Sequence, residues 1–194
     1  MPFNVNGNIL TNLQIKHYNE STIVRSGLLV YLDAGIASSY NGIGTTWIDL
    51  SGNNYNATLT NGPSYTKSGR GSIVFDGTND YAAINVNSWI RSTSSAYTFS
   101  SFFYYNGGPN GGSPYCIMTT PNDGNTNDGF WQHLNFNGIW YWRTEDNVSG
   151  EFGGNVENSS GFSNGNWYHL AIVVKTNSLI FYRNGIQVAS ISTT

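Results

Sequence analysis

Aromatic side chains are concentrated in one short segment, WQHLNFNGIWYWR, at residues 131–143. The Asn-Gly pair in its middle predicts a tight hairpin turn. Because side chains alternate along a strand, Trp140 and Trp142 share one face and Tyr141 takes the other. If the two tryptophans point outward, they form a platform on which a sugar ring can stack, and if they point inward they belong to the core. The pattern leaves both arrangements open.

A carbohydrate site also needs polar groups that fix the hydroxyls of the sugar. The preceding loop and the end of the hairpin offer amide and carboxylate groups, and the first strand of the hairpin adds a third indole. The predicted ligand-binding residues are Trp131, Trp140, Trp142, Asn122, Asp123 and Glu145.

Oxygen-bearing side chains cluster at a second place, the segment DGTND at residues 76–80. Carboxylate and amide oxygens are the ligands that Ca²⁺ prefers, which makes Asp76, Asn79 and Asp80 candidate metal ligands. The same residue types are favoured in turns, where their side chains accept hydrogen bonds from nearby backbone N–H groups. Both interpretations stay open at this point, and the sequence points to no other cofactor.

The sequence lacks the patterns of an enzyme active site. Glycoside hydrolysis needs two carboxylates about 5–9.5 Å apart across a groove, whereas the acids of residues 145–157 lie in a segment typical of a solvated loop. No histidine has a serine or cysteine in a nucleophile setting, and HExxH and paired CxxC motifs are missing. His169 is instead expected to be a strand residue with a hydrogen-bond partner. The chain is therefore expected not to be an enzyme, with glycoside hydrolysis kept as an alternative.

Composition narrows the fold and the partners. The 194 residues include 23 Gly, 13 Tyr, 10 Phe and 6 Trp, with only 10% charged residues and a net charge of −3. Strand and turn formers thus replace helix formers. No basic cluster is present to bind nucleic acid, no apolar run is long enough to span a membrane, and the first residues do not resemble a secretory signal.

Strand-like segments recur from residue 27 onward. GLLVYLDAG, at residues 27–35, predicts a strand buried on both faces, and residues 36–65 predict a long loop held by spaced apolar side chains. Residues 96–106 and 166–175 alternate as strands do. In all, about nine or ten short strands predict an all-β, two-sheet antiparallel sandwich.

The amino-terminal segment differs from the rest. Residues 1–26 are polar and irregular, with only short apolar patches. We therefore expect an N-terminal arm or leader at 1–26, followed by a single sandwich domain at 27–194.

Three motifs resemble the laminin-G-like, concanavalin A-type jelly roll. They are GLLVYLDAG with GTTWIDLSGNNYNATLTNGPSY, then GSIVFDGTNDYAAI, and finally GNWYHLAIVV with LIFYRNGIQVAS. Together they cover residues 27–190, and the first two also resemble laminin-G-like domains of bacteriophage structural and tail proteins. The resemblance implies a lectin-like β-sandwich located on a virion or another extracellular surface.

In relatives, the pattern continues beyond the Asn184-Gly185 hairpin with one more strand that runs beside the first strand. The resemblance therefore implies a sandwich that lacks its final strand in this chain. An open apolar edge of this kind is rarely left bare. Either the sequence is a fragment of a longer protein, or a neighbouring segment or a second copy completes the sheet.

These observations lead to one expected function and two alternatives. The expected function is a non-enzymatic carbohydrate-recognition module displayed on a phage particle as a structural or adhesion component. The first alternative is a purely structural virion decoration or attachment protein that binds neighbouring subunits. The second is the glycoside hydrolase. The expected partners are thus a surface glycan or virion subunits, with a homo-oligomer also open.

Overall fold

The computed structural model describes residues 3–5, 8–10, 23–84, 96–106, 115–119, 129–134, 140–146, 150–156, 162–175 and 178–192. In these residues the regular structure is all β, and every strand pairing is antiparallel. The strands are β1 (Phe3–Val5), β2 (Asn8–Leu10), β3 (Thr46–Trp47), β4 (Ala57–Thr60), β5 (Ser64–Thr66), β6 (Ser72–Val74), β7 (Tyr81–Ile84), β8 (Tyr97–Tyr105), β9 (Tyr115–Thr119), β10 (Gly129–Leu134), β11 (Trp140–Asp146), β12 (Gly150–Asn155), β13 (Asn166–Lys175), β14 (Ser178–Arg183) and β15 (Ile186–Ser192).

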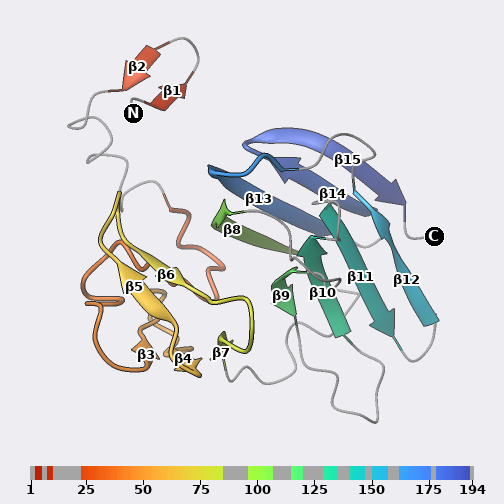
Figure 1. Cartoon of the computed structure of the whole chain (residues 1–194). Coiled ribbons are helices and arrows are strands. Elements are labelled where there is room, and N and C mark those ends of the chain that lie inside the picture. The colour runs from red at the N-terminus through yellow and green to blue at the C-terminus, as the bar shows by residue number, and fades with distance from the viewer. Residues whose placement is uncertain are drawn as a thin grey trace. The chain divides into compact units, whose positions relative to one another are not determined.

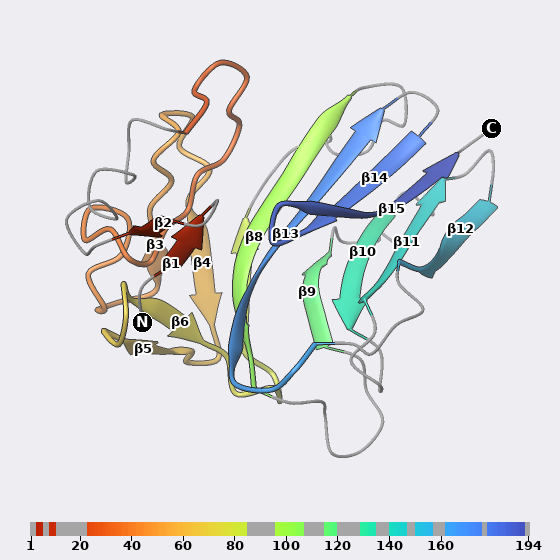
Figure 2. The same ribbon diagram turned by 90° about the horizontal axis from the view of Figure 1, so that it is seen from above.

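The chain divides into two compact units, Met1–Val86 and Asn87–Thr194. The first unit has a three-stranded sheet, β3-β4-β7, and two strand pairs, β5-β6 and β1-β2. The second has two four-stranded sheets, ordered β15-β14-β13-β8 and β12-β11-β10-β9 (Figures 1 and 2). The expected arm at residues 1–26 stays a prediction, because most of it lies outside the described residues.

Apolar side chains from both four-stranded sheets form the core of the second unit. Trp140 and Trp142 of β11 are buried together with Leu170 and Ile172 of β13 and with Phe181 of β14. The rings of Trp140 and Phe181 meet edge-on with centroids 5.4 Å apart. Because β11 and β14 belong to different sheets, this packing holds the two sheets face to face. The predicted all-β antiparallel sandwich is confirmed.

Strand β8 shows why one sheet of this sandwich has two different faces. Tyr97 and Phe99 are partly buried and pack against the core, whereas Phe102 and Tyr104 are exposed. The alternation continues on β13, which pairs with β8 from Asn166↔Tyr105 to Val174↔Tyr97. Both strands were expected from the sequence, and both are present.

The turn between β14 and β15 has the geometry that its sequence predicts. Asn184 has φ 51° and Gly185 has φ 80°, both in the left-handed region. Asn184 also joins β13, since its N–H donates to the carbonyl of His169 at 2.8 Å and its Oδ1 accepts from the N–H of His169 at 2.9 Å. The turn residue therefore extends the hydrogen bonding of the sheet.

The left-handed turn between β14 and β15 should make Gly185 sensitive to substitution. Gly185→Ala should cost about 1 kcal/mol of unfolding free energy, because a Cβ disfavours the left-handed conformation. A Cβ at this position would contact nothing within 4 Å, so the cost is one of backbone conformation alone. Urea unfolding measures it. The control is the exposed neighbour Ile186→Ala, expected within about 0.5 kcal/mol of the wild type; equal costs for the two variants would contradict the argument.

The predicted strand at residues 27–35 is wrong. This segment forms no strand, and Leu29 is 42% exposed. Side chains distant in sequence bind its backbone in place of a neighbouring strand: Ser51 Oγ donates to the carbonyl of Leu29, and the N–H of Tyr31 donates to Asp49 Oδ1 at 2.8 Å. These backbone groups are thus paired without a strand ladder.

Asp49 is a buried carboxylate at the centre of the first unit's loops. It is 6% exposed and accepts hydrogen bonds from the backbone N–H groups of Tyr31, Ser51 and Tyr55, as well as from the Ser51 hydroxyl. Burial alone would raise the pKa of Asp49, but these hydrogen bonds to the charged form outweigh it and hold the pKa below its ordinary value of 3.8. Its role is structural.

Candidate functional site

The structure decides between the two arrangements of the central tryptophans. Trp140 and Trp142 are each 1% exposed and lie in the core between the sheets. The outward arrangement is therefore wrong, and these two indoles do not form an exposed platform. The physical reason is their contact with Phe181 of the opposite sheet, whose ring lies 5.4 Å from that of Trp140 and 5.7 Å from that of Trp142.

The other predicted ligand-binding residues keep the status of predictions. Asn122 and Asp123 lie outside the described residues. Trp131 is on β10 opposite Arg143, and Glu145 is on β11 between Gly129 and Glu151. These positions place Trp131 and Glu145 in the same sheet without assigning either of them a ligand.

The three candidate metal ligands lie in one turn between β6 and β7. Asp76 Oδ1 accepts from the N–H groups of Thr78, at 2.8 Å, and Asn79, at 3.3 Å, and Asp80 Oδ2 accepts from the N–H of Asp76. The N–H of Thr78 is the main cause that lowers the pKa of the exposed Asp76 carboxyl. The structure thus displays the predicted turn chemistry, and Ca²⁺ binding at Asp76, Asn79 and Asp80 stays a prediction.

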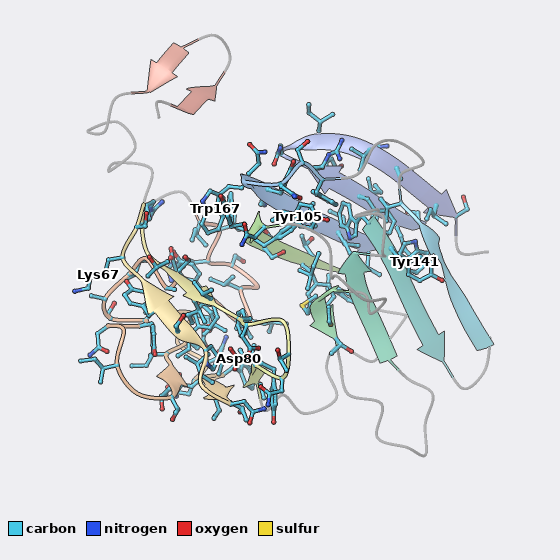
Figure 3. The ribbon with its side chains drawn as sticks, in the orientation of Figure 1. Lys67, Asp80, Tyr105, Tyr141 and Trp167 are labelled. Atoms are coloured by element: carbon cyan, nitrogen blue, oxygen red, sulfur yellow. The ribbon has the colours of Figure 1, made fainter. Side chains whose placement is uncertain are left out.

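A different group of aromatic residues lies on the outer face of β8 and β13. We call Phe102, Tyr104, Trp167 and His169 the aromatic strip. Phe102 is 70%, Tyr104 48% and Trp167 50% exposed. The register pairs Trp167 with Tyr104 and His169 with Phe102 across the two strands. Figure 3 labels Trp167 at the start of β13, and Tyr105 marks the adjoining end of β8.

Contacts between paired rings hold the side chains of the aromatic strip in a defined arrangement. The rings of Tyr104 and Trp167 are 5.6 Å apart between centroids, and those of Phe102 and His169 are 4.6 Å apart with an interplanar angle of 32°. Cross-strand aromatic pairs of this kind contribute to sheet stability. The pairing therefore holds exposed rings in a fixed arrangement before any ligand arrives, which lowers the entropic cost of binding.

His169 gives the strip a polar group. Its Nε2 forms a hydrogen bond of 2.8 Å with the Ser100 hydroxyl, next to Phe102 on β8, as the sequence predicted for a strand histidine with a partner. Partial burial lowers the pKa of His169 below its ordinary value of 6.5. The imidazole is therefore neutral at neutral pH, and the strip carries no histidine charge there.

The outer face around the strip is almost free of charge. Beyond the strip, the outward positions of β8, β13 and β14 in the described residues are Thr98, Ser100, Ala171, Val173, Lys175, Ser178, Ile180 and Tyr182. Lys175, the last residue of β13, is the charged member of this set. A surface of exposed rings with hydroxyl and imidazole groups can stack on the apolar faces of sugars and bond to their hydroxyls.

The alternation of residues 166–175 puts Trp167 and His169 on one face of β13, but neither was among the predicted ligand-binding residues. The signal was present in the alternation of residues 96–106 and 166–175. The alternation does not show which face of these strands the opposite sheet covers. In the structure, β11 covers the face of Leu170 and Ile172 and leaves the strip exposed.

The two four-stranded sheets of the second unit define an antiparallel β-sandwich domain. Residues 76–194 match the family model described as the concanavalin A-like lectin/glucanases superfamily. Because this match spans more than half of the chain, the protein belongs to the concanavalin A-like lectin/glucanase superfamily.

Comparison with solved structures gives a weaker likeness. A crystal structure of an S-layer domain-containing protein from Clostridium thermocellum is 19% identical, with a TM-score of 0.48, over 84% of this chain and 71% of that chain. At this score the likeness carries no argument about function. No curated protein matches the sequence. Among the described residues, no helix has the length and hydropathy to cross a membrane.

Proposed function

We propose that the chain is a non-enzymatic carbohydrate-binding module and that sugar rings stack on the aromatic strip. The observation that carries the proposal is the exposure of Phe102, Tyr104 and Trp167 on the face of the sheet that points away from the core. Large aromatic side chains normally lie in the core, so exposed rings gathered on one surface indicate a binding site. Membership of a lectin and glucanase superfamily supports a sugar as the ligand.

Glycan-array binding by the full chain tests this function. We expect at least one carbohydrate to bind, and Trp167→Ala to weaken that binding about tenfold or more through the loss of a stacking surface. The matched control is Ile186→Ala, which removes a similarly exposed apolar side chain from β15 of the same sheet. Equal binding by the wild type and Trp167→Ala would overturn the assignment of the site.

We also propose that binding is not followed by catalysis. The outward positions of β8, β13 and β14 in the described residues include no carboxylate, so the strip lacks the acid pair that glycoside hydrolysis requires. Release of reducing ends from a bound polysaccharide would overturn this part of the proposal. Display on a virion is a proposal carried by the sequence resemblance, and immunolabelling of purified particles tests it.

A further inference from the structure

The proposed function leaves open which kind of carbohydrate the strip selects. We infer that the strip binds an extended, uncharged polysaccharide chain through its internal sugar units, laid along β8 and β13. This inference rests on the proposed function and adds the ligand class. Three features of the outer face support it: the direction of the rings, the small side chains beyond them, and the scarcity of charge.

The rings follow the direction of the strands. Trp167 and Tyr104 form the first cross-strand pair and His169 and Phe102 form the second. Residues two apart on a strand are roughly 6.6–6.8 Å apart, so the two pairs provide successive stacking positions along one line. A linear ligand can contact both pairs at once, whereas a single terminal sugar covers one.

The surface beyond the rings continues with small side chains. The next register pair along the same face is Ala171 with Ser100, followed by Val173 with Thr98. Small side chains at these positions leave room for a chain to pass in the same direction. A site for a terminal sugar instead encloses its ligand in a concave pocket.

The charge of the outer face indicates whether its ligand is a neutral or an acidic polysaccharide. Recognition of a polyanion depends on several Lys or Arg side chains and weakens as salt increases. Among the described outward positions of β8, β13 and β14, Lys175 is the charged residue, and it lies at the end of β13 that is far from Trp167. The protein's net charge of −3 also disfavours an anionic polymer. A neutral chain fits this surface.

Affinity electrophoresis of the full chain tests the ligand class, with hydroxyethyl cellulose, galactomannan and dextran as neutral probes and polygalacturonate as the acidic probe. We expect retardation by at least one neutral polymer, unchanged between low and high salt. With oligosaccharides of that polymer, the dissociation constant should fall at least about tenfold from the disaccharide to the hexasaccharide, because the longer chain covers both ring pairs.

A gain-of-binding variant makes the test sharper. Thr98 is exposed and lies on the line of the strip, so Thr98→Tyr adds a stacking ring at a position where strand propensity favours it. We expect tighter binding of the long polymer and unchanged binding of the disaccharide. Thr98→Ser is the control, expected to bind as the wild type does.

The outcomes separate the two proposals. If no carbohydrate binds, the proposed function fails and the inference fails with it. If a carbohydrate binds but its binding does not depend on Trp167, the assignment of the site and the inference both fail. If polygalacturonate binds in a salt-dependent way, or if a monosaccharide competes as well as a long chain does, the module is still a carbohydrate binder but the inferred ligand class is wrong.

Discussion

Replacing Trp140 by alanine is expected to lower the free energy of unfolding of the second unit by about 3–5 kcal/mol. The indole is 1% exposed and packs edge-on against Phe181 of the facing sheet. Its removal takes away buried apolar area and leaves a cavity between the sheets, and both effects are unfavourable. Chemical denaturation followed by circular dichroism measures the loss.

Two variants serve as controls for this prediction. Trp167→Ala removes the same side chain from the exposed face, so we expect a much smaller stability change but a loss of carbohydrate binding. Trp140→Phe keeps a ring in the core and removes an indole N–H that is buried with no hydrogen-bond partner in the described structure. Because an unpaired buried donor is itself unfavourable, this variant should cost much less than alanine. If Trp140→Ala abolished binding without loss of stability, the core assignment would be wrong.

Replacing Asp49 by alanine should have the second large effect, a loss of about 3 kcal/mol or more from the stability of the first unit. The substitution leaves the N–H groups of Tyr31, Ser51 and Tyr55 without their common acceptor. Hydrogen exchange of peptides from residues 23–84 should show faster exchange over the whole loop region. The control is Asp76→Ala, which removes an exposed carboxylate from another turn and should cause far less change.

The same residue predicts a dependence on pH. The pKa of Asp49 is lowered on folding, so its contribution is fully present above the ordinary value of 3.8 and is lost as pH falls through the lower pKa of the folded state. Asp49→Asn should be less stable than the wild type at neutral pH. On acidification, its free energy of unfolding should fall less than that of the wild type. If the unfolding free energies of the two proteins fell by the same amount on acidification, this account would be contradicted.

Local patterns predicted much of the second unit. The alternation in residues 96–106 and 166–175 predicted β8 and β13, and the Asn184-Gly185 pair predicted the left-handed turn that follows β14. These features depend on neighbouring residues, so a sequence window contains the information. Alternation along residues 140–142 likewise predicted that Trp140 and Trp142 share a face. It did not predict whether that face is buried, because Tyr141 makes both sides of the strand aromatic.

The errors arose where distant residues decide the structure. Residues 27–35 have the composition of a strand, yet Asp49 and Ser51 occupy their backbone groups from about twenty positions away. The pattern of apolar residues within a short segment contains no information about such a contact. The aromatic strip was missed for a similar reason, since only the packing of the opposite sheet shows that the outer face of Trp167 is exposed.

Asn184 connects the turn after β14 with the backbone of His169 on β13. It reverses the chain after β14, and it also holds the peptide group of His169 through a pair of hydrogen bonds. The backbone of the strip at His169 is thus hydrogen-bonded to a turn that lies outside the four rings. If sugars stack on the strip as we propose, substitutions at this turn should alter ligand affinity from a distance, which gives mutation a route to adjust binding strength without changing any contacting ring.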